Sequence, residues 1–361
     1  MQTRFSALCA HISPIDPALR QQAQAHLDNL TKPQGSLGRL ETAAVQLFSI
    51  QHGSAPALSP DPAIMFTVAG DHGVAEEGVS PFPQAVTRQM VLNFLQGGAG
   101  INVLCKSSGM DLKVVDAGCA GGPFAPHPLL LDRRLGDGTA NFTHGPAMSR
   151  EACLQALLHG AQLAADAAEA GYRCVGAGEM GIANTTPATA LYCACLGLEP
   201  ENIVGPGAGA NQEMMRRKTR VVRAALSVNA PLLRDGDAVD RLAALGGFEI
   251  AVMAGVMLGG ARHGMAVLVD GFISTSAFVA ARSLCPALDD YCFLTHASAE
   301  PGYAPVVAAL GKTPPLLHLG LRLGEGTGAA LALPLLRAAA AIYNDMATFA
   351  QAGVTGTPCN P

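Results

Sequence analysis

The 361-residue sequence predicts an α/β protein whose mostly parallel β-sheet carries helices on both faces. Three observations support this fold class. Several short apolar runs are typical of strands that are buried on both faces, as strands of a parallel sheet are. Most of these runs end in small, glycine-rich loops, and helical segments separate them. In such a sheet ligands bind outside the carboxyl ends of the strands, where the glycine-rich loops would lie.

Six segments are predicted as strands. The clearest is 63–69 (AIMFTVA), because this run is continuously apolar and leads directly into 70–73 (GDHG). The other five follow the same rule, each ending in a small residue or a polar loop. They are 112–116, 172–175, 202–204, 266–270 and 291–294.

Helices at the two ends of the chain are expected to pack together as a smaller domain. Segment 17–30 is helical, and the apolar residues of 37–47 recur at helical spacing. The last segment, 329–351, is helical again, with Thr327 as a candidate N-cap. We therefore predict a small helical domain formed by residues 1–60 and 329–361, and a larger catalytic domain formed by residues 61–328.

Composition limits the kinds of partner. The net charge is -5, Trp is absent and aromatic residues are 5%, so nothing favours nucleic acid or an anionic membrane as a partner. The N-terminus lacks the apolar segment of a signal peptide, and the longest apolar stretch is shorter than the roughly 20 residues that span a bilayer. The ten cysteines show neither zinc nor disulfide spacing. We expect a cytoplasmic protein with reduced, mostly buried cysteines.

Glu325 is the strongest candidate for chemistry. It lies in 324–328 (GEGTG), between an apolar run and a long helix, and its glycines permit a sharp turn and a close approach by a ligand. A solvated glutamate in a surface turn is the competing interpretation. The pattern recurs, however, at Glu179 in 178–181 (GEMG), just before a predicted helix start. Buried carboxylates at strand ends are suited to general-base catalysis, because burial raises their pKa.

Two other loops are weaker candidates. Segment 205–209 (GPGAG) could present backbone N–H groups to a phosphate, and a basic cluster follows at 216–220. The loop 205–209 lacks the acidic residue, about 20 positions further along the chain, that a dinucleotide-binding fold would need. Asp71 and His72 could form a metal or acid–base pair, but a hydrogen-bonded core histidine is the favoured interpretation. Because no further ligand lies at metal spacing, no metal site is predicted.

Five motifs, in chain order, resemble those of the nicotinate-nucleotide–dimethylbenzimidazole phosphoribosyltransferases. The resemblance implies a Rossmann-like large domain, a small helical domain from both termini, and assembly as a dimer. It also implies phosphoribosyl transfer from nicotinate mononucleotide to 5,6-dimethylbenzimidazole, a step toward the lower ligand of cobalamin. The motifs are 32–41 (KPQGSLGRLE), 71–74 (DHGV), 178–187 (GEMGIANTTP), 246–249 (GGFE) and 323–326 (LGEG).

The resemblance also assigns roles to individual residues. Glu325 matches the base, and Glu179 matches a second glutamate of the site. No cofactor or metal is implied, because the pyridinium of the donor is already an activated leaving group. Positions expected around the phosphoribosyl group are Gly181, Gly205, Gly207, Lys218 and Ser298. Positions expected to line the acceptor pocket are Phe82, Met90 and Met180.

Three alternatives stay open at this point. One branch of the family transfers to phenols and works as a heteromeric pair, and the apolar acceptor lining would suit a phenol or p-cresol. The partner chain could therefore be identical or a paralogue. A nucleotide-dependent oxidoreductase is disfavoured by the missing ribose-binding acidic residue. A non-catalytic subunit is disfavoured because both glutamates are present.

Overall fold

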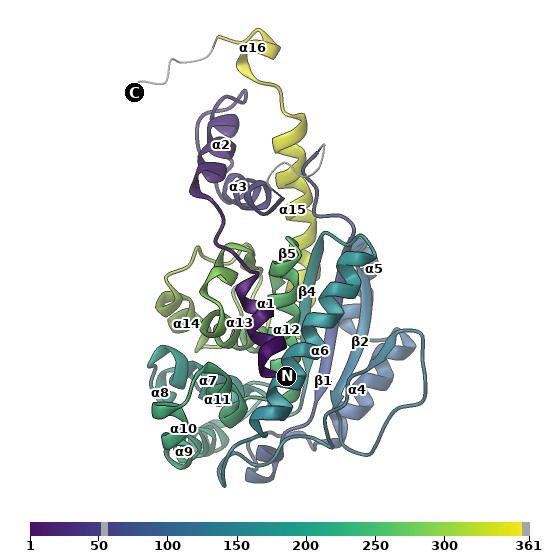
Figure 1. Cartoon of the computed structure of the whole chain (residues 1–361), viewed down its shortest axis with the longest axis vertical. Coiled ribbons are helices and arrows are strands. Elements are labelled where there is room, and N and C mark those ends of the chain that lie inside the picture. The colour runs from purple at the N-terminus through teal and green to yellow at the C-terminus, as the bar shows by residue number, and fades with distance from the viewer. Residues whose placement is uncertain (52–56, 356–361) are drawn as a thin grey trace.

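The computed structural model describes residues 1–51 and 57–355, and it confirms the predicted fold class (Figure 1). All strands of its sheet are parallel, and their spatial order is β3-β2-β1-β4-β5-β6. Within this described part no helix is long and apolar enough to cross a membrane. The strands are β1 Ala63–Gly70, β2 Asp111–Gly118, β3 Leu130–Asp132, β4 Cys174–Met180, β5 Ala266–Val269 and β6 Cys292–Leu294.

The strand order reverses between β1 and β4. From β1 the chain builds outward through β2 and β3, and it then returns to the other side of β1 and continues through β4, β5 and β6. Val68 of β1 lies opposite Glu179 of β4, next to the carboxyl ends of both strands. In open parallel sheets the crevice at such a reversal is where ligands bind.

Helices cover both faces of the sheet (Figure 1). Ile64, Phe66 and Val68 of β1 belong to the core cluster that includes α6 and α12. Ala63, Met65 and Ala69 belong to the cluster that includes α3, α5 and α15. This alternation follows from the two-residue period of a strand. The α-helices are α1 Gln2–Ala10, α2 Pro17–Asp28, α3 Arg39–Gln51, α4 Ala85–Gln96, α5 Gly100–Ser108, α6 Arg150–Glu169, α7 Thr185–Leu196, α8 Pro200–Ile203, α9 Gln212–Val228, α10 Ala230–Asp235, α11 Ala238–Leu245, α12 Phe248–Arg262, α13 Phe272–Leu284, α14 Tyr303–Leu310, α15 Thr327–Asp345 and α16 Phe349–Ala352.

One predicted strand is wrong. Residues 202–204 lie at the end of α8, which has Pro200 at its first position. A short apolar run does not distinguish strand from helix, and a proline at the first helical position favours the helix. The three-residue edge strand β3 was not predicted, because its partly exposed residues carry no continuous apolar signal. The strand predicted at 172–175 starts and ends later, so Glu179 lies inside β4.

The start of α15 also differs from its prediction. Gly326 occupies the N-cap position, and Thr327 is the first helical residue. The Thr327 hydroxyl donates to the carbonyl of Gly324 at 2.8 Å. Thr327 therefore closes the turn that precedes the helix, whereas the predicted role was to accept from the first helical amides.

The two ends of the chain pack in different places. In Figure 1, α2 and α3 lie beside the far half of α15, beyond the sheet. By contrast, α1 packs on α6 and α12, and Phe5 and Ile12 join the core on that face. The placement of α1 thus differs from a small domain that contains all of residues 1–60. The domain boundaries themselves stay a prediction.

Candidate active site

A cavity of about 410 Å³ opens at the carboxyl ends of the central strands. Its walls come from the β4–α7 connection, the residues after β5 and β6, the loop before α15, and the α4 region. Both predicted glutamates line it. The sheet reversal and the cavity therefore coincide.

Glu325 is held by three contacts. Its backbone φ is +63°, a left-handed conformation that costs a residue with a side chain about 1–2 kcal/mol. The hydroxyl of Thr67 on β1 donates to the Glu325 carbonyl at 2.8 Å. The backbone N–H of Ile101, in the first turn of α5, donates to the Glu325 carboxylate at 3.0 Å. A Cβ on Gly178 would lie 2.3 Å from the Glu325 carbonyl carbon, so this turn fits only against a glycine.

Glu179 is also held by a hydrogen bond and by the space that a glycine leaves. The side-chain amide of Asn184 donates to its Oε2 at 2.5 Å, and only 6% of the residue is exposed. A Cβ on Gly324 would lie 2.1 Å from Glu179 Oε1. Gly178 thus makes room for the backbone of Glu325, and Gly324 makes room for the carboxyl group of Glu179. The two glycine-framed glutamates form one interlocked unit.

The two carboxyl groups differ electrostatically. Burial raises the pKa of Glu179 to about 8, and the negative charges of Glu249, Asp270 and Glu325 add to this shift. Glu179 therefore holds a proton at neutral pH. Burial also raises the pKa of Glu325, but the N–H of Ile101 at a helix N-terminus stabilises the charged form. Glu325 is therefore the better proton acceptor of the two.

Of the five residues predicted around the phosphoribosyl group, three lie at the surface of the cavity and two do not. Gly181, Gly207 and Ser298 line it. Lys218 lies behind this lining, where its Nζ donates to the Thr185 hydroxyl at 2.8 Å and to the Gly205 carbonyl at 3.0 Å. Burial lowers the pKa of Lys218 to about 8. Lys218 and Gly205 therefore support the loop from beneath.

Arg322 is a cavity residue that the sequence interpretation missed. Its guanidinium donates to the Gly207 carbonyl at 3.0 Å, and its side chain lines the cavity. Asn184, Asp270 and His296 also line the cavity without having been predicted. A usable signal existed for Arg322, because it stands three positions before Glu325 in the same loop.

Phe82, Met90 and Met180, predicted to line the acceptor pocket, all border the cavity and make one side of it apolar.

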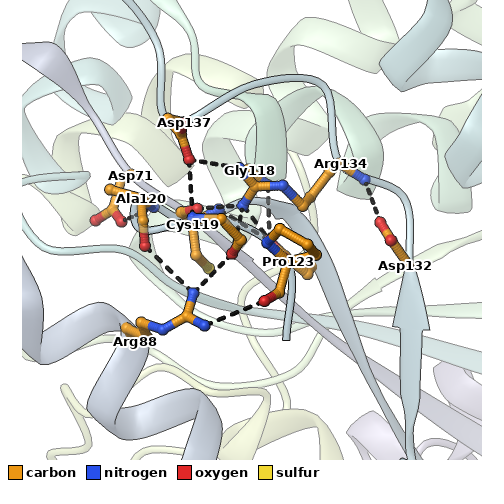
Figure 2. A network of polar contacts seen from close by, with 11 residues as sticks. Asp71, Arg88, Gly118, Cys119, Ala120, Pro123, Asp132, Arg134 and Asp137 are labelled. Carbon is orange, nitrogen blue, oxygen red and sulfur yellow. Dashed lines mark hydrogen bonds and ion pairs between the residues drawn. The ribbon is translucent and has the colours of Figure 1, made fainter. Parts of the chain in front are cut away.

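The helix α4, which carries Met90, is held by contacts on two sides. On one side, Arg88 donates to the carbonyls of Gly122 and Pro123 (Figure 2). Its guanidinium also lies 4.0 Å from the centre of the Phe124 ring. On the other, the Ile182 N–H donates to the Thr87 hydroxyl at 3.0 Å.

Asp71 and His72 each have a partner from another part of the chain. His72 pairs through Nε2 with Glu249 on α12 at 2.8 Å, and both side chains are buried. Asp71 accepts from the N–H of Ala120 at 2.7 Å, within the polar network of Figure 2. Among the described residues no cluster of three or more His, Cys, Asp or Glu side chains is arranged to hold a metal ion.

A family model described as phosphoribosyltransferase matches residues 12–354, which places the chain in this class of transferase. A nicotinate-nucleotide–dimethylbenzimidazole phosphoribosyltransferase from Nitratidesulfovibrio vulgaris (strain DP4) is 64% identical over 95% of this chain and 96% of its own. The relative of that name from Chlorobaculum tepidum is 51% identical over 99% of each chain. The crystal structure of the Thermus thermophilus enzyme has a TM-score of 0.88 and 44% identity, covering 95% of this chain and all of that one. The chain belongs to the nicotinate-nucleotide–dimethylbenzimidazole phosphoribosyltransferase family.

The raised pKa of Glu179 predicts a pH-dependent stability. A carboxyl group whose pKa is raised in the folded state stabilises the protein fully below its unfolded pKa of about 4.5, and this contribution is lost as the pH rises toward 8. The loss is on the order of 1.4 kcal/mol per pH unit in that interval. Glu179→Gln should therefore be more stable than wild type at pH 8 and lose this advantage near pH 4.5. Denaturant unfolding at both pH values measures the difference.

Glu151→Gln, on the exposed start of α6, is the matched control and should show no such pH-dependent gain. Equal stability of the Glu179→Gln variant and wild type at every pH would contradict a neutral, buried Glu179.

Proposed function

We propose that this protein transfers phosphoribose from nicotinate mononucleotide to 5,6-dimethylbenzimidazole, giving α-ribazole 5′-phosphate and nicotinate. The observation that carries the proposal is the interlocked pair Glu179 and Glu325 at the carboxyl ends of the central strands. The names of the relatives support it. A cavity of about 410 Å³ lies in the usual range for small-molecule sites, which is about 300–1,000 Å³.

The donor needs no acid to leave. Its glycosidic nitrogen is cationic, so the bonding electron pair returns to the ring and nicotinate departs with a neutral ring nitrogen. A nitrogen lone pair of the acceptor attacks the anomeric carbon from the opposite face, which inverts β to α. The new benzimidazolium then loses its remaining N–H proton to Glu325. General-base assistance of this kind is typically worth about 10²–10⁴-fold.

Glu179 has a different role in this proposal. With its proton retained at neutral pH, it donates a hydrogen bond and orients one reactant beside Glu325. Arg322, with Gly207 and Ser298, forms the polar side of the cavity and receives the anionic phosphoribosyl end of the donor. Lys218 adds positive charge from beneath the same loop.

The apolar wall of Phe82, Met90 and Met180 keeps a second acceptor class in consideration. It would accommodate a phenol, whose oxygen would replace the benzimidazole nitrogen as nucleophile.

We also propose that the chain works as a dimer. Exposed apolar side chains at the cavity mouth, Phe82 and Leu323, support this proposal because a partner subunit would cover them.

The acceptor prediction is tested with purified protein and nicotinate mononucleotide. We expect a phosphoribosylated product with 5,6-dimethylbenzimidazole and at least tenfold lower kcat/KM with p-cresol. Mass spectrometry of the products, with adenine as a third acceptor, measures the ranking. Transfer to p-cresol alone would replace the benzimidazole proposal with the phenolic one, and transfer to no acceptor would end both.

Glu325→Gln should lower kcat by about 10²–10⁴-fold while the KM for nicotinate mononucleotide changes little, because the amide cannot accept the proton. In wild type, kcat should fall as the pH drops through the raised pKa of Glu325. Initial rates from pH 5 to 9 measure both effects. A Glu325→Gln variant with near-normal turnover would remove the proposed base from the mechanism.

A further inference from the structure

Asp270 is a buried carboxylate that the proposed mechanism does not use. It directly follows β5, its side chain borders the cavity, and only 1% of it is exposed. A buried carboxylate has a high desolvation cost unless hydrogen bonds satisfy its oxygens. Its partners therefore indicate what it stabilises.

Its hydrogen-bond partners are the first amides of α15, and Nδ1 of the buried His296 lies 3.5 Å from its Oδ1. Oδ1 of Asp270 accepts from the N–H groups of Gly328 at 2.7 Å and Ala329 at 3.1 Å. Oδ2 accepts from the N–H of Gly326 at 3.2 Å. The N-cap residue of α15 is Gly326, which has no side chain to fill this role. Asp270 thus caps the helix from a different strand, where a local Ser, Thr, Asn or Asp would ordinarily do so.

Asp270 is itself fixed to the sheet. Its N–H donates to the Ser274 hydroxyl at 3.1 Å, and that hydroxyl donates to the Ala177 carbonyl of β4 at 2.8 Å. The Thr295 hydroxyl, just after β6, donates to the Asp270 carbonyl at 3.1 Å. The cap is therefore anchored to three adjacent strands.

This anchored cap lies next to the strained residue of the site. Glu325 immediately precedes Gly326, whose amide Asp270 binds. A left-handed conformation at Glu325 persists only if its surroundings determine the backbone on both sides. Thr67 holds the carbonyl of Glu325, and Asp270 holds the amides that follow it.

We propose that Asp270 is a positioning residue that fixes the Glu325 turn by capping α15 from β5, so that the Glu325 carboxylate stays aimed into the cavity. The inference deepens the proposed function and rests on Glu325 being its base. Asp270 does not react with either substrate. Its effect on catalysis is transmitted through the backbone of residues 325–329.

The test compares Asp270→Asn and Asp270→Ala with Asp237→Asn. Asp237 is a matched control, because it also caps a helix, α11, but it lies at the exposed end of that helix and does not border the cavity. We expect the Asp270 variants to lose about 10²-fold in kcat, since a displacement of about 1 Å at a reacting group has that effect. The KM for nicotinate mononucleotide should stay within about threefold, and the control should keep wild-type kinetics.

A second readout does not depend on activity. Amide hydrogen exchange at residues 326–330 should accelerate at least tenfold in both Asp270 variants, more in Asp270→Ala, while the amides of β1 and β4 keep their protection. In the double variant Asp270→Asn/Glu325→Gln, kcat should equal that of Glu325→Gln, because both changes remove the same function. A wild type without transferase activity would defeat the proposed function, yet the exchange measurement would still test the cap.

The pH profile is a third readout, because the charge of Asp270 contributes to the raised pKa of Glu325. Titratable or charged side chains that share the cavity with Glu325 come from β4 (Glu179), from the ends of β5 and β6 (Asp270 and His296), and from its own loop (Arg322). Removing the Asp270 charge should move the acidic limb of the residual Asp270→Asn activity to lower pH. Unchanged exchange at residues 326–330, additive losses in the double variant, or a raised KM with normal kcat would overturn the proposal.

Discussion

The site depends on one steric constraint, the mutual accommodation of two glycine-framed glutamates. Gly178 leaves space for the backbone of Glu325, and Gly324 leaves space for the carboxyl group of Glu179. Neither glutamate can therefore take its position unless the glycine beside the other is present. The strand β4 and the loop before α15 are more than 140 residues apart in the sequence, and this contact joins them at the sheet reversal.

Because the two glutamates are packed together at the sheet reversal, several carboxyl groups are buried in one cavity. Glu179 responds by retaining its proton, whereas Glu325 and Asp270 receive backbone N–H groups at the starts of α5 and α15. Helix N-termini favour negative charge, so the two helices offset part of the desolvation cost. The same arrangement places a protonated carboxyl group beside a more readily ionised one, which in the proposed mechanism separates the hydrogen-bond donor from the base.

The sequence predicted the parallel sheet, most of its strands and both glutamates, because continuous apolar runs and glycine-framed carboxylates are local signals. It could not show that each glycine serves the opposite glutamate, since that contact exists only after folding. Asp270 was missed for the same reason, whereas Arg322 was missed although its place in the Glu325 loop was a usable signal. An aspartate after a strand carries no sign that its partners are amides of a distant helix. Residues 202–204 were misassigned because a run this short, with only Ile203 and Val204 apolar, suits a short helix as well as a strand. The roles of Phe82, Met90 and Met180 stay predictions, although all three border the cavity.

The most direct measurement of the central claim leaves both glutamates unchanged and fills the space between them. In Gly178→Ala the new methyl group would meet the Glu325 backbone at 2.3 Å, whereas in the control Gly176→Ala it would meet the flexible ends of Met65 and Met110. If the two glutamates are interlocked, kcat for phosphoribosyl transfer should fall at least 10²-fold in Gly178→Ala and less than tenfold in Gly176→Ala. Near-normal turnover in a folded Gly178→Ala protein would contradict the account.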